Sequence, residues 1–326
     1  MRNENPLYQN IGDELNLGKL FAIEKIQTLW SGYGQLVRLK FSNKNIIVKH
    51  VKLPKLSQHP RGWNTNLSHK RKLHSYQVEV NWYKNFSKKI DGNCRIPKGI
   101  KTFQNENEWL IVMEDLSSSG FTTIATIAYR THLRTVIKWL ANFHAKYMNV
   151  KTDIVWKIGT YWHLDTRPDE LELLEDKELK KYAKIIDDKL NNCRYQTIVH
   201  GDAKLANFCF NKEGTLCAAV DFQYIGHGCG MKDLIYFMSS AIEPEVSEKM
   251  QDWVLNTYFE ELEKALEYYQ VNIKSSDVKK EWEILFPIAW ADFQRFIKGW
   301  SPNHFKINAY TEELTVKALN YLKSII

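Results

Sequence analysis

The stretch of sequence that decides the fold reads HGDAKLAN at residues 200–207 and resumes with DFQ at residues 221–223. Both pieces follow short apolar runs that predict strands, so each strand ends in a carboxylate, Asp202 in the first and Asp221 in the second. Asn207 adds an amide fourteen residues before Asp221. Phosphoryl transfer requires metal ions on the phosphates and a positioned nucleophile, and carboxylates and an amide at strand ends supply much of this.

Upstream of this stretch the pattern changes from strands to helices. Short β-branched or alternating runs predict five strands, at residues 26–30, 36–41, 46–48, 100–103 and 109–113. Between the two predicted hairpins, Ser75 is expected to cap a helix that carries Glu79. Beyond residue 117 the apolar spacing is mainly helical. We therefore expect an α+β fold with a small antiparallel-sheet lobe at residues 1–116 and a larger, mainly helical lobe at residues 117–326.

The composition, 44% hydrophobic and 25% charged, is that of a globular protein. The net charge of +7 is unevenly distributed along the chain. Residues 52–72 hold six basic side chains without an acidic one, whereas residues 232–326 hold 11 basic and 15 acidic ones. No nucleic-acid motif, secretory signal or membrane-length apolar run is recognised, so we expect a cytoplasmic protein that binds neither nucleic acid nor membrane.

The order of these residues resembles the catalytic and metal-binding loops of the protein-kinase superfamily. The His-Gly-Asp start is similar to the aminoglycoside phosphotransferase and choline kinase group, and within it to the ecdysteroid-kinase-like branch. The resemblance covers residues 26–240 and includes LANFHA at residues 140–145 and the segment 230–237. It implies a two-lobed, protein-kinase-like fold with ATP and Mg²⁺ bound between the lobes.

Carried across by position, the resemblance implies a role for each residue of the 200–221 region. Asp202 is expected to be the base that orients the substrate hydroxyl, and Lys204 to approach the γ-phosphate. Many aminoglycoside-type enzymes lack a lysine at this position. Asn207 and Asp221 are the implied ligands of Mg²⁺.

The resemblance also implies a nucleotide site in the first lobe. Lys49 resembles the lysine that holds the α- and β-phosphates, and Glu79 resembles its helix-borne partner. No third glycine follows Gly32 and Gly34 at the protein-kinase spacing. The remaining implied contacts are the glycines of the phosphate loop and the hinge beside adenine: Gly32, Gly34, Glu114 and Leu116.

Other prominent residues are interpreted as structural. His144 lies on an apolar helical face and is expected to be a packed, hydrogen-bonded core histidine. Asp233 is expected to be the N-cap of a helix and, by the resemblance, to brace the catalytic loop. An aromatic stripe is expected to pack in the core, with a substrate wall as the alternative: Trp290, Phe293, Phe296 and Trp300.

These observations predict a small-molecule kinase that phosphorylates a hydroxyl. An aminoglycoside or choline-like cation would suit the acidic C-terminal third, and an apolar alcohol would suit its aromatic residues alone. The alternatives are a catalytically silent nucleotide-binding or scaffold protein, and a protein kinase, which the absence of Ala-Pro-Glu disfavours. The basic segment 52–72 is predicted to be a loop that orders over the nucleotide, with Arg61 and residues 70–72 as its contacts.

Overall fold

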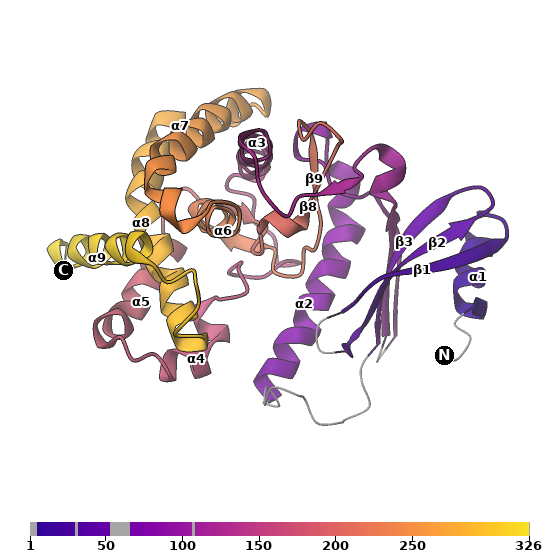
Figure 1. The fold of residues 1–326 in the computed structure, drawn as a ribbon, viewed down its shortest axis with the longest axis horizontal. Helices are drawn as coiled ribbons and strands as arrows, with labels where there is room; N and C mark the ends of the chain where they lie inside the picture. Colours follow the sequence, from indigo (N-terminus) through magenta and orange to yellow (C-terminus); the bar gives the residue numbers. More distant parts are fainter. Residues whose placement is uncertain (1–4, 30–31, 53–65, 106–107, 326) are drawn as a thin grey trace. The chain divides into compact units, whose positions relative to one another are not determined.

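The computed structural model describes residues 5–29, 32–52, 66–105 and 108–325. The chain divides into two compact units (Figure 1). Unit 1 comprises Met1–Ile90 and Ile96–Thr122, and unit 2 comprises Asp91–Arg95 and Thr123–Ile326.

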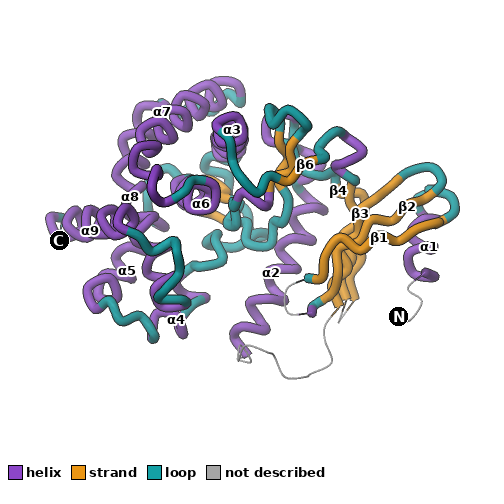
Figure 2. The backbone as a smooth tube through the Cα atoms, in the orientation of Figure 1, coloured by secondary structure: helices purple, strands orange, loops and turns teal. Residues whose placement is uncertain are grey.

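Unit 1 is built on a five-stranded sheet (Figure 2). Its strands are β1 (Leu20–Thr28), β2 (Gly34–Phe41), β3 (Asn45–Lys52), β4 (Gly99–Asn105) and β5 (Glu108–Glu114). They lie in the order β1-β2-β3-β5-β4, and all neighbours pair antiparallel. Both predicted hairpins are confirmed. The first strand was misplaced: it begins at Leu20 and ends at Thr28, whereas the sequence predicted residues 26–30.

The core of unit 1 lies under one face of this sheet. Val37 and Leu39 of β2 and Val48 of β3 are fully buried, because alternate residues of a strand point to the same face. Helix α1 (Asn5–Glu14) packs here through Tyr8 and Ile11. The sequence analysis missed this helix because its polar residues outnumber its apolar ones; the spacing of Tyr8 and Ile11, three residues apart, was the available signal.

Helix α2 (Asn66–Asn85) begins earlier than predicted. Ser75 is not its cap but lies inside it, where its hydroxyl donates to the carbonyl of Lys72 at 2.8 Å. Residues 66–74 contain no glycine or proline, so nothing in them stops the helix from extending upstream. Lys70, Arg71 and Lys72 therefore belong to a helix and not to a loop. Lys52 ends β3, and residues 53–65 of the predicted nucleotide loop, Arg61 included, lie outside the described residues.

Unit 2 is mainly helical. Its long helices are α3 (Arg130–Lys146), α5 (Lys177–Asn191), α6 (Met231–Ala241), α7 (Pro244–Tyr268), α8 (Ser275–Trp300) and α9 (Ala309–Ser324), with a short α4 (Pro168–Glu172). Its strands are β6 (Thr123–Ile124), β7 (Thr197–Val199), β8 (Phe208–Phe210), β9 (Cys217–Ala219) and β10 (Gly226–Gly228). β7 pairs with β10, and β8 lies between β6 and β9. The predicted α+β class, with a helical C-terminal part, is confirmed.

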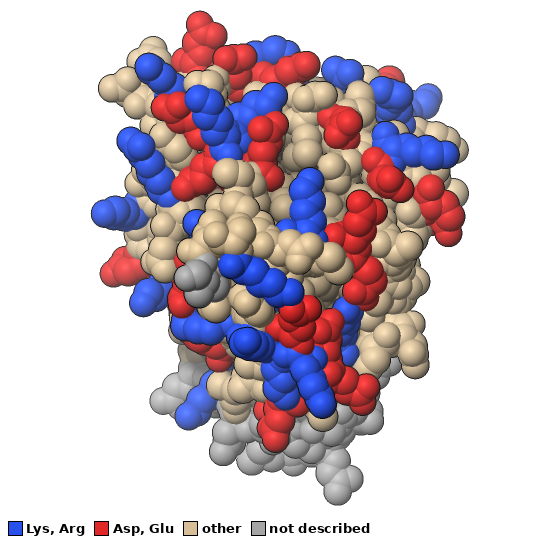
Figure 3. Space-filling model, turned by 90° about the vertical axis from the view of Figure 1, so that its left-hand side faces the viewer, with Lys and Arg blue, Asp and Glu red and all other residues tan. Residues whose placement is uncertain are grey.

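Basic and acidic side chains are interspersed on the surface shown in Figure 3. Within the described ranges, no helix combines the length and apolar composition that crossing a membrane requires.

The contact between α1 and the sheet can be tested by truncating Ile11, which is 3% exposed. Ile11→Ala should lower the free energy of unfolding by about 2–5 kcal/mol, because it leaves a cavity between α1 and the sheet. Ile23→Ala is the matched control, since Ile23 is 38% exposed on β1 and should cost much less. Urea unfolding measures both variants; equal losses would show that α1 does not contribute to the core.

Candidate active site

The loop that begins at His200 follows directly from β7. Gly201 adopts φ 78°, and a Cβ added there would lie 2.0 Å from the carbonyl oxygen of Tyr224. A side chain at this position would therefore clash with backbone as well as strain the loop. The glycine of the His-Gly-Asp triplet is explained by this close approach.

The carboxylate of Asp233 holds this loop in place. Asp233 lies in the first turn of α6, where its Oδ2 accepts from the backbone N–H of His200 at 2.6 Å and its Oδ1 from that of Gly201 at 2.9 Å. His144 Nε2 lies 3.1 Å from Oδ2, and His144 Nδ1 lies 2.7 Å from the hydroxyl of Tyr258. His144 and Asp233 are fully buried. Both residues are structural, as predicted, but Asp233 is not an N-cap: the N-cap of α6 is Gly230, and Asp233 is the third residue of the helix.

The imidazole of His200 connects the two predicted catalytic segments. The backbone N–H of Asp202 donates to His200 Nδ1 at 3.3 Å, so this nitrogen is an acceptor. Nε2 then carries the proton and donates it to the carbonyl of Val220 at 3.0 Å. Val220 is the residue before Asp221, and His200 is fully buried. The ring thus sets the position of one carboxylate relative to the other.

Asp202, Lys204 and Asn207 are brought together by short contacts. Oδ2 of Asp202 accepts from Lys204 Nζ and from Asn207 Nδ2, each at 3.0 Å. Asn207 Nδ2 also donates to the backbone carbonyl of Asp202 at 2.8 Å. Asp202 is only 7% exposed. Its carboxylate is therefore held in one orientation.

Burial and charge determine the protonation of this cluster. Burial raises the pKa of Asp202, and the Asp221 carboxylate raises it further, against the opposing effect of Lys204. Burial opposes the charge of Lys204, but the carboxylates of Asp202 and Asp221 outweigh burial and raise its pKa. Asp202 is accordingly a stronger base than a solvated aspartate.

The residues present fit a magnesium ion. Asp221 follows β9 in the left-handed region, at φ 69°, and its Oδ1 accepts from Gln223 Nε2 at 2.7 Å. Asn207 uses its amide nitrogen on Asp202, which leaves its carbonyl oxygen as the atom that can face a cation. No group of three His, Cys, Asp or Glu suited to a metal occurs in the described ranges. Mg²⁺ is commonly held by one or two carboxylates plus substrate phosphates, so oxygen ligands of this kind suffice.

In unit 1, the structure brings Lys49 and Glu79 together. Lys49 Nζ on β3 lies 2.6 Å from Glu79 Oε2 on α2, and the two side chains are 6% and 1% exposed. Glu114 ends β5 and accepts from the N–H of Lys98 at 2.9 Å. Leu116, buried, begins the short 3-10 helix Leu116–Ser119.

Of the two glycines of the predicted phosphate loop, Gly32 lies between β1 and β2, and Gly34 is the first residue of β2. Gly32 adopts φ 74° with open space around it. At Gly34, a Cβ would lie 2.0 Å from the carbonyl of His50, so strand packing alone requires a glycine there. Nucleotide contacts of Gly32, Gly34, Lys49, Glu79, Glu114 and Leu116 stay predictions.

Sequence reasoning missed two residues close to Asp202. Tyr236 lies on α6, and burial together with Tyr161 and Asp202 raises the pKa of its hydroxyl. Lys306 lies between α8 and α9, and its charge interacts with those of Asp202 and Lys204. The only signal for Tyr236 was its position three residues after Asp233. Lys306 had none, because it is 104 residues from Asp202 in the chain.

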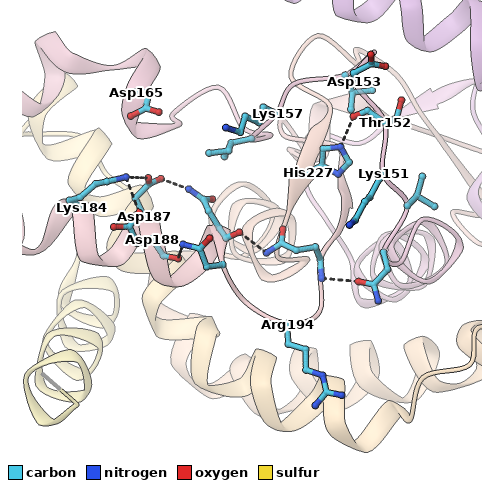
Figure 4. A pocket seen from close by; sticks show the side chains of 17 residues that line it. Lys151, Thr152, Asp153, Lys157, Asp165, Lys184, Asp187, Asp188, Arg194 and His227 are labelled. Carbon is cyan, nitrogen blue, oxygen red and sulfur yellow. Dashed lines mark hydrogen bonds and ion pairs between the residues drawn. The ribbon is translucent and has the colours of Figure 1, made fainter.

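A cavity of about 1280 Å³ lies elsewhere on unit 2 (Figure 4). It is lined by residues of the segment 149–158, of α5 and of the loop after it, and by His227. Lys184 points toward Asp187 and Asp188 and contacts the latter at 2.8 Å. Asp202, Asn207 and Asp221 do not line this cavity. Because its charges are mixed and partly paired, we assign it no catalytic role.

Asp233 gives the first test of this site. Asp233→Ala should lower the free energy of unfolding, because the N–H groups of His200 and Gly201 lose their acceptor and each buried, unsatisfied group costs about 1–3 kcal/mol. Asp252→Ala, at an exposed position on α7, is the control and should change stability by no more than about 0.5 kcal/mol. Denaturant unfolding compares the two, and equal effects would contradict the bracing role.

A double-mutant cycle tests the buried pair of unit 1. Lys49→Met and Glu79→Gln should each cost about 3–5 kcal/mol, because each leaves a buried charge without its partner. The double variant should cost less than the sum. The exposed pair of Lys184 and Asp188, 66% and 51% exposed, is the control and should couple by about 1 kcal/mol or less. Strict additivity at Lys49 and Glu79 would show that their contact contributes nothing.

Comparison with known proteins agrees with this geometry. The model of the ecdysteroid kinase-like family matches residues 157–271, a segment that contains Asp202, Asn207, Asp221 and Asp233. The match extends past the C-terminal limit expected from the sequence and does not include residues 1–156. No match is found among curated proteins.

Solved structures resemble the chain over almost its whole length. A microcompartment-associated aminopropanol kinase aligns with a TM-score of 0.51 at 12% identity, covering 97% of this chain and 94% of its own. Spectinomycin phosphotransferase APH(9)-Ia, in complex with ADP and spectinomycin, aligns with a TM-score of 0.50 at 11% identity, covering 97% and 93%. Choline kinase LicA from Streptococcus pneumoniae gives 0.43 at 14% identity, covering 98% and 99%. The alignments with the aminopropanol kinase and the spectinomycin phosphotransferase show that the fold is kinase-like, and the resemblance to the ecdysteroid kinase-like family is confirmed over residues 157–271.

Proposed function

We propose that this chain is a small-molecule kinase that transfers the γ-phosphate of ATP to an alcohol hydroxyl with the help of Mg²⁺. The single observation that carries the proposal is the buried carboxylate of Asp202, held by Lys204 and Asn207 at 3.0 Å each. The charge of Asp221 acts on the same carboxylate. A base, a cation and oxygen ligands in one cluster are what phosphoryl transfer requires.

In this proposal Asp202 accepts a hydrogen bond from the substrate hydroxyl and takes its proton as the oxygen attacks. A new bond forms between that oxygen and the γ-phosphorus while the bond from the γ-phosphorus to the β,γ-bridging oxygen breaks, releasing ADP. Lys204 offsets the negative charge of the transferring group. Asn207 and Asp221 would hold Mg²⁺, which neutralises the phosphates when bound.

The buried pair in unit 1 fits the same reaction. Lys49 would bind the α- and β-phosphates of ATP, and Glu79 keeps its ammonium group charged and in place. The ion pair does not by itself show nucleotide binding, because buried pairs also occur as structural elements. ATP binding by this unit is therefore part of the proposal.

The deciding experiment measures magnesium-dependent conversion of ATP to ADP by the whole chain against a library of small alcohols, with and without EDTA. We expect turnover that requires both the metal and an alcohol. Binding of ATP without turnover toward any alcohol would instead support the silent nucleotide-binding alternative, and transfer to a protein substrate would support the protein-kinase alternative.

Asp202→Asn tests the base directly. Turnover should fall about 10²- to 10⁴-fold, the usual contribution of a positioned acid-base group, while ATP affinity stays near that of the wild type. Unchanged turnover in the folded variant would remove Asp202 from the mechanism.

The same variant has an expected effect on stability. The pKa of Asp202 is higher in the folded chain than in the unfolded one, so the wild type loses stability as the pH rises between these two values. The Asn variant has no such titration. The melting temperature of the Asn variant minus that of the wild type should therefore increase as the pH rises across that window. A decrease in this difference would contradict the raised pKa of Asp202.

A further inference from the structure

An aromatic wall extends from the candidate base. It consists of Tyr161, Tyr236 on α6, and Phe293 and Phe296 on α8. The ring centroids of Tyr161 and Tyr236, of Tyr236 and Phe293, and of Tyr161 and Phe296 are each 5.4 Å apart. Tyr236 links this wall to the candidate base, since its pKa is raised by burial first and then by the neighbouring Tyr161 and Asp202. The predicted core packing of the α8 aromatics is confirmed for Trp290, Phe293 and Phe296, which are at most 2% exposed, whereas Trp300 is 39% exposed.

Lys306 places an ammonium group on this wall. Its Nζ lies 4.6 Å from the ring centroid of Tyr236 and 5.6 Å from that of Phe293. The backbone of Lys306 is fixed: its carbonyl accepts from Gln294 Nε2 at 3.1 Å and from Thr311 Oγ1 at 3.2 Å. The side chain of Lys306 therefore extends from a backbone that is fixed by two hydrogen bonds.

No ion pair of Lys306 is found among the described residues. The carboxylate whose charge acts on it, Asp202, is already bonded to Lys204 and Asn207. Burial lowers the pKa of Lys306 to about 8, with Asp202 opposing this effect and Lys204 adding to it. The other titratable groups near it are His304, whose pKa it helps to lower, and the Tyr236 hydroxyl.

The acidic residues of the C-terminal third do not form ion pairs with Lys306 among the described residues. On α7 most of them are exposed, as Glu245, Glu248 and Glu260 are, and acidic and basic side chains mix on the surface in Figure 3. The buried ones are already engaged, Asp233 by the catalytic loop and Asp292 by Arg295 at 2.9 Å. A cationic substrate would therefore meet Lys204 and Lys306 at the site, where the buried carboxylates are already bonded.

We propose that Lys306 is the substrate-recognition cation of this site and binds an anionic group, a carboxylate or a phosphate, on the alcohol that Asp202 orients. This inference rests on the proposed function for the identity of the reaction, but not for the binding itself. An anion that enters here pairs with a cation already stripped of much of its water, so the ion pair forms in a setting where it is strong. The carbon skeleton of the alcohol packs on the half-buried ring of Tyr161, because the other three rings have almost no exposed surface.

The test begins with binding, because binding can be read without turnover. Isothermal titration of the full chain uses three alcohols of similar size: glycerate, which carries a carboxylate, glycerol 3-phosphate, which carries a phosphate, and neutral glycerol. Choline serves as the cationic probe. The wild type should bind one or both anionic alcohols at least tenfold more tightly than glycerol or choline, and the better of the two identifies the kind of anion.

Variants at Lys306 then show whether this side chain is responsible for binding the anion. Lys306→Met keeps the apolar stem against Tyr236 and Phe293 but removes the charge, and should weaken the anionic alcohol on the order of 10- to 100-fold, as expected for a charged hydrogen bond. Lys306→Arg should restore much of the affinity. Lys317→Met, on the exposed side of α9, is the matched control and should bind as the wild type does. Anion binding should also weaken above about pH 8, where Lys306 loses its proton.

Two outcomes overturn the proposal. One is binding of neutral or cationic alcohols in preference to the anionic ones, with no change in Lys306→Met. The other is unchanged binding of the anionic alcohol in Lys306→Met with turnover lowered equally for every alcohol, because Lys306 would then act on the transferring phosphate. Anion-selective binding that depends on Lys306 but is never followed by ADP formation would instead contradict the proposed function and leave this inference standing.

Discussion

The site depends on the carboxylate of Asp233, which accepts hydrogen bonds from two backbone N–H groups. The His200 and Gly201 amides point into a buried region, where an unsatisfied donor is costly. Asp233 meets this need from the first turn of α6 and is itself contacted by His144 of α3. Three segments distant in the chain are thereby joined at one carboxylate. The position of Asp202, one residue further, follows from this junction.

The same site also shows why a buried base is costly to keep. Asp202 is almost enclosed, and burial disfavours its charge. Lys204 and Asn207 reduce this penalty without removing it, so the group stays more basic than a solvated carboxylate. A protein selected for stability alone would place a neutral side chain here. The retained carboxylate is thus better explained by chemistry than by folding.

The distribution of charge in unit 2 differs from what the net charge of the C-terminal third suggests. That third is acidic in sum, which would suit a cationic substrate, one of the two alternatives left open by the sequence. The structure separates the acidic residues into exposed ones on the helix surfaces and buried ones already bonded, and it directs Lys306 to the aromatic wall beside Asp202. Net charge over a segment cannot distinguish these positions, because helices send neighbouring residues to opposite faces.

The sequence by itself determined the fold class, both hairpins of unit 1 and the cluster of Asp202, Lys204, Asn207 and Asp221. These features depend on alternation within strands and on close spacing along the chain, which a sequence displays directly. Only the tertiary structure decided that α2 begins at Asn66, because a serine can either cap a helix or bond within it. It alone brought Lys306 to the site, since a contact across 104 residues depends on how α6, α8 and the connection to α9 pack together, and no local pattern encodes that packing.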